Sequence, residues 1–253
     1  MATFQMEIAN KIIEVHALFE TTEEFCRDFI TEGEPDFTVT VTPEDIRQEK
    51  RRFDESNAAG ENKTTDNGME VLVLHRKIAR QMLEYDTLLF HGAALCYEDQ
   101  AYIFAAGSGT GKTTHSRLWL RYIKGARMLN GDKPMLQIRD GAVYCCGTPW
   151  RGKESYGGNE VRPLKAIVFL KRSPTNYIEK ISSSEAFPEM IRQAYRPPDG
   201  NLSKAVSLIS QMGKSVEYYR LSCNMTVGAL QTSFETLTNK KLKDSLWETY
   251  EMK

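Results

Sequence analysis

The first third of the chain alternates short apolar patterns of two periods, which predicts a small unit of mixed strands and helices. Thr3–Ile8 and Lys11–His16 have the spacing of two strands. Asp36–Val41 places an apolar residue at every second position, as a half-buried strand does. The pattern therefore predicts a sheet that buries one face.

Helical spacing separates these strands. Thr21–Ile30 predicts a helix that begins with Thr21 or Thr22 as its N-cap. Its expected apolar stripe consists of Phe25, Phe29 and Ile30. A second start signal is Thr42-Pro43-Glu44-Asp45, with Pro at the first helical position. Ser56–Asn67 is rich in Asn, Gly and Thr and predicts a mobile loop, and a longer helix is expected from Met69 to Tyr85.

The pattern changes at Leu88, where apolar runs predict interior strands. We expect one strand over Leu88–Tyr97 and the next over Ala101–Ala105. Further strands are expected at Met128–Leu129, Met135–Arg139, Val143–Cys146 and Leu164–Lys171. Asp140-Gly141 predicts a hairpin turn. Helices are expected at Ser184–Ala194, Leu202–Met212 and Thr226–Leu237. The fold class predicted is α/β, with an N-terminal α/β lobe over 1–85 and a larger domain over 86–253.

Composition excludes several classes of function. The 33 Lys and Arg nearly balance 34 Asp and Glu, which argues against wholesale nucleic-acid binding. No apolar run approaches the roughly 20 residues that span a bilayer. The first residues lack the pattern of a signal peptide. The five cysteines form no Cys-x-x-Cys pair, so we expect buried free thiols in a cytoplasmic protein.

The segment from Ala101 to Thr114 carries the chemistry. A buried strand enters a glycine-rich turn, and a helix leaves it near Lys112. Backbone N–H groups of such a turn converge on phosphate oxygens, and the helix N-terminus adds partial positive charge. Lys112 is expected to reach the β- and γ-phosphates of ATP, and Thr113 to bind Mg²⁺. The predicted nucleotide-binding residues are Gly107, Ser108, Gly109, Thr110, Gly111, Lys112, Thr113 and Thr114.

Other residues are candidates for the reaction itself. Asp132, twenty residues after Lys112, is expected to be a metal ligand and catalytic carboxylate, with a simple turn residue as the alternative. His91, in the strand before the loop, is either an acid–base group or a core histidine. Arg151 and Lys153 follow a strand and either neutralise phosphoryl charge or form an exposed basic loop.

The string Gly-Ser-Gly-Thr-Gly-Lys-Thr-Thr resembles the loop of ATP-dependent phosphoenolpyruvate carboxykinases. The order of a His, this loop and an Asp-containing turn, within Leu88–Lys171, resembles the catalytic domain of HPr kinase/phosphorylase and its smaller stand-alone relatives, some of which phosphorylate a serine of a precursor peptide. The resemblance implies a P-loop nucleotide domain and active-site roles for His91, Lys112, Thr113 and Asp132. It also implies self-association, because the related kinases tend to self-associate.

The chain departs from that family at one position. HPr kinases carry two adjacent aspartates in the turn, whereas this chain has Gly131-Asp132. Either Asp132 performs both roles, or His91 or Glu154 supplies the base, or the chemistry is impaired. The signature segment for the HPr partner and the manganese ligands of the carboxykinases are not found.

Three functions remain open at this stage. The first is a kinase that uses ATP and Mg²⁺ to phosphorylate a hydroxyl, on Ser or Thr of a peptide or small protein. The second has a small-molecule alcohol as its acceptor. The third is a nucleotide-binding regulatory module without transfer activity, which the missing aspartate favours. A peptide kinase should have an open groove beside Trp150, and a metabolite kinase a closed polar pocket.

Overall fold

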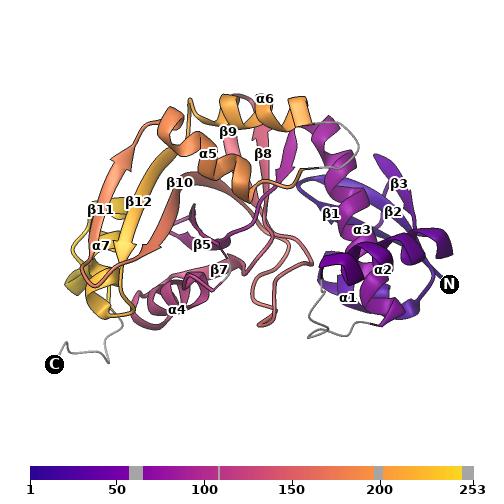
Figure 1. Ribbon diagram of the computed structural model, residues 1–253, viewed down its shortest axis with the longest axis horizontal. Helices are drawn as coiled ribbons and strands as arrows, with labels where there is room; N and C mark the ends of the chain where they lie inside the picture. The colour runs from indigo at the N-terminus through magenta and orange to yellow at the C-terminus, as the bar shows by residue number, and fades with distance from the viewer. Residues whose placement is uncertain (57–64, 108, 197–201, 247–253) are drawn as a thin grey trace. The chain divides into compact units, whose positions relative to one another are not determined.

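The computed structural model describes residues 1–56, 65–107, 109–196 and 202–246 (Figure 1). The chain divides into two compact units, Met1–Tyr85 and Asp86–Lys253. Both contain strands and helices, so the α/β class predicted from the sequence is confirmed. No helix among the described residues is long and apolar enough to cross a membrane. The predicted loop at Ser56–Asn67 falls largely on residues 57–64, which lie outside the described residues.

The described part of the first unit has a three-stranded sheet in the order β1-β2-β3. β1 (Ala2–Ile8) and β2 (Lys11–Ala17) form an antiparallel hairpin, and β3 (Phe37–Thr40) pairs parallel with β2. One face of the sheet is buried, as the alternating pattern predicts. The helical elements are α1 (Glu20–Cys26), η1 (Arg27–Phe29), α2 (Pro43–Ser56), α3 (Asp66–Met82) and η2 (Leu83–Tyr85).

The start of α1 depends on a buried carboxylate from α3. The side chain of Glu70 is fully buried and accepts hydrogen bonds from the backbone N–H groups of Leu18 (2.6 Å) and Phe19 (3.1 Å). It also accepts one from the hydroxyl of Thr22. The N-cap is Phe19, so the predicted cap at Thr21 or Thr22 is wrong.

The predicted apolar stripe of this helix is also largely wrong. Phe25 and Ile30 are exposed, and only Phe29 is buried. Thr22 and Cys26, four residues apart on one helical face, point inward instead. The reason is the bond between Thr22 and Glu70, a contact between distant segments that the local apolar spacing does not contain.

Within the described residues, the sheet of the second unit has nine strands, and the long strand β10 (Val161–Arg172) joins its two parts. The first half of β10 pairs antiparallel with β9, whereas its second half pairs parallel with β6 and β12. The other strands are β4 (Thr87–Leu89), β5 (Ala93–Tyr97), β6 (Gln100–Ala105), β7 (Arg127–Asn130), β8 (Met135–Arg139), β9 (Ala142–Cys146), β11 (Tyr177–Ile181) and β12 (Glu217–Cys223).

Helices cover both faces of this sheet. Figure 1 shows α4 and α7 on one side and α5 and α6 on the other. Phe104 of β6 packs in an aromatic cluster with Trp119 of α4 and Phe234 of α7, and its neighbour Ile103 faces the opposite layer. The helical elements are α4 (Lys112–Tyr122), α5 (Ser183–Gln193), α6 (Leu202–Met212), α7 (Val227–Thr238) and η3 (Leu242–Asp244).

Two predictions about these strands need correction. The predicted strand Leu88–Tyr97 is broken into β4 and β5, which pair with different partners. Gly92 lies at the break, where an added Cβ would approach the side chain of Ile103 to 2.7 Å. Strands β11 and β12 are absent from the sequence prediction. The hairpin at Asp140-Gly141 is confirmed.

The cysteine prediction holds in most of its detail. All five cysteines lie in described residues as free thiols. Four are buried, and Cys223 at the end of β12 is partly exposed.

The buried side chain of His115, a residue of α4, faces α7. The ring Nε2 of His115 lies 3.0 Å from the hydroxyl oxygen of Ser233, which also accepts from the indole of Trp119 and donates to the carbonyl of Leu230. Because that hydroxyl has one proton to donate, His115 Nε2 is the donor to Ser233. Within the described residues His115 Nδ1 has no hydrogen-bond partner. Burial lowers the pKa of His115 to about 4, so the ring is neutral.

We expect the second unit to lose stability on acidification. Between its unfolded pKa of 6.5 and its folded pKa of about 4, His115 binds a proton in the unfolded chain and not in the folded one. The free energy of unfolding therefore decreases as the pH is lowered, by about 2 kcal/mol between roughly pH 7 and pH 5. Urea titrations followed by tryptophan fluorescence measure this, because all three tryptophans follow residue 86.

The matched variant is His115→Gln, which keeps an N–H donor for Ser233 and cannot titrate. Its free energy of unfolding should vary less with pH by that amount. An identical pH dependence in the two proteins would contradict the assignment of a neutral His115.

We also expect Glu70→Ala to destabilise the first unit by about 2–4 kcal/mol, because it leaves two backbone N–H groups and a hydroxyl unsatisfied in the interior. Hydrogen exchange of the amides of Leu18 and Phe19, read by mass spectrometry, should accelerate accordingly. Glu24→Ala, an exposed substitution on α1, is the control. Equal exchange in the two variants would refute the capping role of Glu70.

Candidate functional site

The glycine-rich segment joins the end of β6 to the start of α4, as the sequence predicts. Gly109 and Gly111 have φ angles of +74° and +121°, which side chains rarely adopt. A Cβ added at either residue would meet no atom within 4 Å, so the space above them is open. None of the described side chains caps α4, whose N-cap is Gly111. The first-turn N–H groups are thus available to an anion. Ser108 lies outside the described residues.

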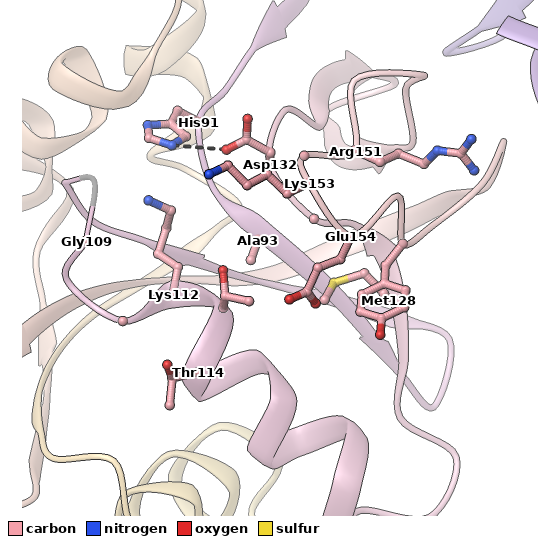
Figure 2. A pocket seen from close by; sticks show the side chains of 15 residues that line it. His91, Ala93, Gly109, Lys112, Thr114, Met128, Asp132, Arg151, Lys153 and Glu154 are labelled. Carbon is pink, nitrogen blue, oxygen red and sulfur yellow. Dashed lines mark ion pairs between the residues drawn. The ribbon is translucent and has the colours of Figure 1, made fainter. Parts of the chain in front are cut away.

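Lys112 folds back over this segment. Its Nζ donates a hydrogen bond of 2.9 Å to the carbonyl of Ala106, the residue that stands where the loop consensus has Gly. Burial lowers the pKa of Lys112, and the negative charge of Asp132 opposes that shift. Thr113 follows on the first turn of α4, with its side chain exposed. Lys112 and Thr113 therefore stand at the open side of the loop, where Figure 2 shows Lys112.

His91 and Asp132 form a hydrogen-bonded pair beside the loop. The Nε2 of His91 lies 3.2 Å from Oδ1 of Asp132 (Figure 2). His91 lies in the break between β4 and β5, not within a strand as predicted. Burial raises the pKa of Asp132, but the hydrogen bond to His91 and the charge of Lys133, whose Nζ is 3.1 Å away, lower it to about 2. Asp132 is therefore ionised at neutral pH.

A buried asparagine holds Asp132 in place. The Oδ1 of Asn130 accepts hydrogen bonds from the backbone N–H groups of Asp132 (2.9 Å) and Lys133 (2.7 Å). The Nδ2 of Asn130 donates to the carbonyl and hydroxyl oxygens of Thr148, each at 3.0 Å. Asn130 is fully buried, and both ends of its amide are satisfied. The sequence analysis did not single out Asn130, because its partner Thr148 is distant along the chain.

A second bond connects the turn to His91. The backbone N–H of Gly92 donates to the carbonyl of Asp132 at 3.0 Å. The His91–Asp132 pair is therefore fixed through the backbone as well as through the side chains.

The backbone of another segment packs tightly against Gly131. An added Cβ at Gly131 would lie 2.4 Å from the carbonyl oxygen of Arg151. One at Gly157 would lie 2.1 Å from the carbonyl oxygen of Leu129. Two segments that are distant in sequence thus approach backbone to backbone at this point. Glycine at 131 is a packing requirement, so a second carboxylate does not fit there in this conformation.

The segment that follows β9 brings Lys153 to the site and turns the guanidinium of Arg151 away from Lys112. In Figure 2 the amino group of Lys153 points toward the His91–Asp132 pair and Lys112. The guanidinium of Arg151 points away from Lys112 and donates to the carbonyl of Gly157 at 2.8 Å. Trp150 is 7% exposed, so its ring offers little surface to a ligand, and the groove expected beside it for a peptide kinase stays a prediction.

Glu154 connects this segment to the helix after the loop. Its carboxylate forms an ion pair with Arg117 of α4. No local sequence pattern predicts this contact, because the two residues are far apart along the chain.

These residues surround a cavity of about 480 Å³. Nine of the predicted site residues line it: His91, Gly109, Gly111, Lys112, Thr113, Thr114, Asp132, Arg151 and Lys153. Gly107 and Thr110 do not, although Thr110 lines an adjacent cavity. Among the described residues no group of three or more His, Cys, Asp and Glu side chains lies together as a metal site. The residues of the cavity that could hold Mg²⁺ are Thr113 and Asp132.

Comparison of the sequence with protein-family models and with curated proteins gives no match. Among solved structures, the chain is similar to the Hpr(Ser) kinase/phosphatase from Coxiella burnetii, with a TM-score of 0.34 and 10% sequence identity. The similarity covers 60% of this chain and 93% of that one. A likeness this weak carries no argument about function.

We expect Gly131→Ala to lower the free energy of unfolding by about 1–3 kcal/mol, because the new Cβ must displace the carbonyl of Arg151. Gly158→Ala is the matched control, since a Cβ there meets no atom within 4 Å. Thermal unfolding of both variants tests the close approach. Equal melting temperatures would show that the backbone of Arg151 gives way without cost.

Proposed function

We propose that the second unit is a kinase that uses ATP and Mg²⁺ to phosphorylate a hydroxyl group. The observation that carries this proposal is a single cavity containing an uncapped helix N-terminus, Lys112, Thr113 and the His91–Asp132 pair. This set combines donors for phosphate oxygens with an ionised carboxylate. The strand–loop–helix context is the one that a phosphate-binding loop requires.

The loop is the binding site for the triphosphate in this proposal. Gly109 and Gly111 leave open space, and the N–H groups at the start of α4 point their partial positive charge toward it. Lys112 exchanges its bond to the Ala106 carbonyl for phosphate oxygens. The hydroxyl of Thr113 and the carboxylate of Asp132 would hold Mg²⁺, which would supply charge neutralisation for the phosphates.

Transfer breaks the bond between the γ-phosphorus and the oxygen bridging to the β-phosphate, and forms one between that phosphorus and the acceptor oxygen. ADP leaves with the bridging oxygen. The acceptor proton passes to the His91–Asp132 pair, and from there to water. With a pKa of about 2, Asp132 holds a proton poorly, so its main contribution is to orient the hydroxyl and the metal. Because phosphoryl transfer passes through a loose transition state, it needs little proton removal by a base.

The single carboxylate bears on how the site works. Because Gly131 cannot carry a side chain beside Arg151, Asp132 has no neighbouring aspartate to share its roles. His91 and Lys133 both contact the Asp132 carboxylate, and of the two only His91 lines the cavity. Of the alternatives open from the sequence, Asp132 acting with His91 fits this arrangement better than Glu154, whose carboxylate pairs with Arg117.

The proposal specifies the acceptor by its chemistry, as a hydroxyl group. Ser or Thr of a peptide or small protein is the first candidate, from the sequence resemblance. A small-molecule alcohol is the second candidate, and the burial of Trp150 leaves its ring little surface for binding a peptide. A regulatory module without transfer activity is favoured by the single carboxylate.

We expect MgATP to raise the melting temperature of the full chain, with about 2.7 kcal/mol of added stability at a hundredfold the dissociation constant. Lys112→Ala should abolish this rise, because it removes the main cation for the phosphates. Lys214→Ala, an exposed lysine that does not line the cavity, should keep it. Thermal unfolding with and without MgATP measures the effect.

Transfer is tested with labelled ATP, a serine peptide library and a panel of small alcohols. Asp132→Asn should weaken MgATP-dependent stabilisation without abolishing it, because Lys112 and the loop remain, and should lower transfer by at least about a hundredfold. Stabilisation without transfer to any acceptor would favour the regulatory module. If MgATP stabilises neither the wild type nor Lys214→Ala, the proposed nucleotide site is excluded.

A further inference from the structure

A second cavity of about 560 Å³ lies next to the glycine-rich segment. It shares Gly109, Gly111 and Thr114 with the first cavity, so the two meet at the loop. None of the ionisable side chains of the first cavity lines it; these are His91, Lys112, Asp132, Arg151, Lys153, Glu154 and Tyr156. The loop therefore has a charged side and a second side of different character.

The second cavity is formed where three parallel strands end. The glycine-rich segment follows β6, Arg172–Pro174 begin at the last residue of β10, and Cys223–Met225 begin at the last residue of β12. β6 and β12 both pair parallel with β10. In open α/β sheets, ligands bind in the crevice outside the carboxyl ends of such strands. Its place in the fold is thus one where a ligand is expected.

The lining of this cavity is mainly apolar. Leu170, Pro174 and Met225 provide apolar surface, and Met225 is 72% exposed. The amide of Asn224 is already engaged, since Nδ2 donates to the carbonyl of Pro174 and Oδ1 accepts from Thr226. His115 lines the cavity with a buried, neutral ring. No carboxylate lines the cavity among the described residues. Such a surface suits a flat, largely uncharged group.

Arg172 provides a cation where this cavity meets the loop. Its guanidinium donates to the carbonyls of Gly109 and Thr110. It lies at the end of β10, on the opposite side of the loop from Lys112. A ligand that spans the loop would therefore meet one cation on each side of its phosphate chain.

From these observations we infer that the second cavity holds the nucleoside, the base and sugar, of the triphosphate bound at the loop. The inference rests on the proposed function. The phosphate chain crosses the loop at Gly109 and Gly111, and the terminal phosphate lies in the first cavity beside Lys112 and Asp132. The acceptor enters that first cavity from the side of Lys153, where the nucleoside does not block it.

The test compares two ligands, MgATP and magnesium tripolyphosphate, which has the phosphate chain without the nucleoside. Calorimetric titration of the full chain measures both dissociation constants. Met225→Ala should weaken MgATP binding about three- to tenfold, because it removes apolar surface that the base covers. It should leave tripolyphosphate binding unchanged. The double variant Pro174→Ala/Met225→Ala should weaken MgATP further.

Leu202→Ala is the matched control. Leu202 is another exposed apolar residue of this unit, 47% exposed on α6, and it lines neither cavity. Its substitution should change neither dissociation constant. Lys112→Ala should weaken the binding of both ligands, since Lys112 contacts the phosphate chain that they share.

The outcomes separate this inference from the proposed function. If MgATP binds the wild type and Met225→Ala equally while Lys112→Ala abolishes binding, the nucleoside lies elsewhere and the proposed function stands. If tripolyphosphate binds the wild type as tightly as MgATP does, the second cavity contributes nothing and the inference fails. If neither ligand binds the wild type, both proposals fall together.

Discussion

The buried amide of Asn130 is the contact on which the geometry of the candidate site depends. It joins the end of β7 to Thr148 and, with its oxygen, holds the backbone of Asp132 and Lys133. A buried amide with both ends satisfied adopts one orientation, because any other leaves donors or acceptors unpaired. Asp132 is therefore presented in a fixed direction.

Close backbone packing around this amide has a consequence for the chemistry. The approach of the Arg151 carbonyl to Gly131 leaves no room for a side chain beside Asp132. The partners of the Asp132 carboxylate are instead His91 and Lys133, whose nitrogens lie 3.2 Å and 3.1 Å from it.

Charge is distributed unequally about the glycine-rich segment. On one side, Lys112 and Lys153 face an ionised Asp132 in a shared cavity. On the other, apolar side chains and the guanidinium of Arg172 border the ends of three parallel strands. A triphosphate has the same division, with an anionic chain at one end and a flat, uncharged base at the other. The match between the two gives the proposed nucleotide a direction across the loop.

The sequence alone determined the elements whose signals are local: the strand, glycine turn and helix over Ala101–Thr114, and the hairpin at Asp140-Gly141. Periodicity and turn chemistry act over a few residues, so they can be read without the fold. Tertiary structure decided the rest. It broke the predicted strand at His91 and paired that residue with Asp132. It turned Arg151 toward Gly157, and in the first unit it capped α1 with Glu70. Each of these is a contact between segments brought together by packing, which no local pattern specifies.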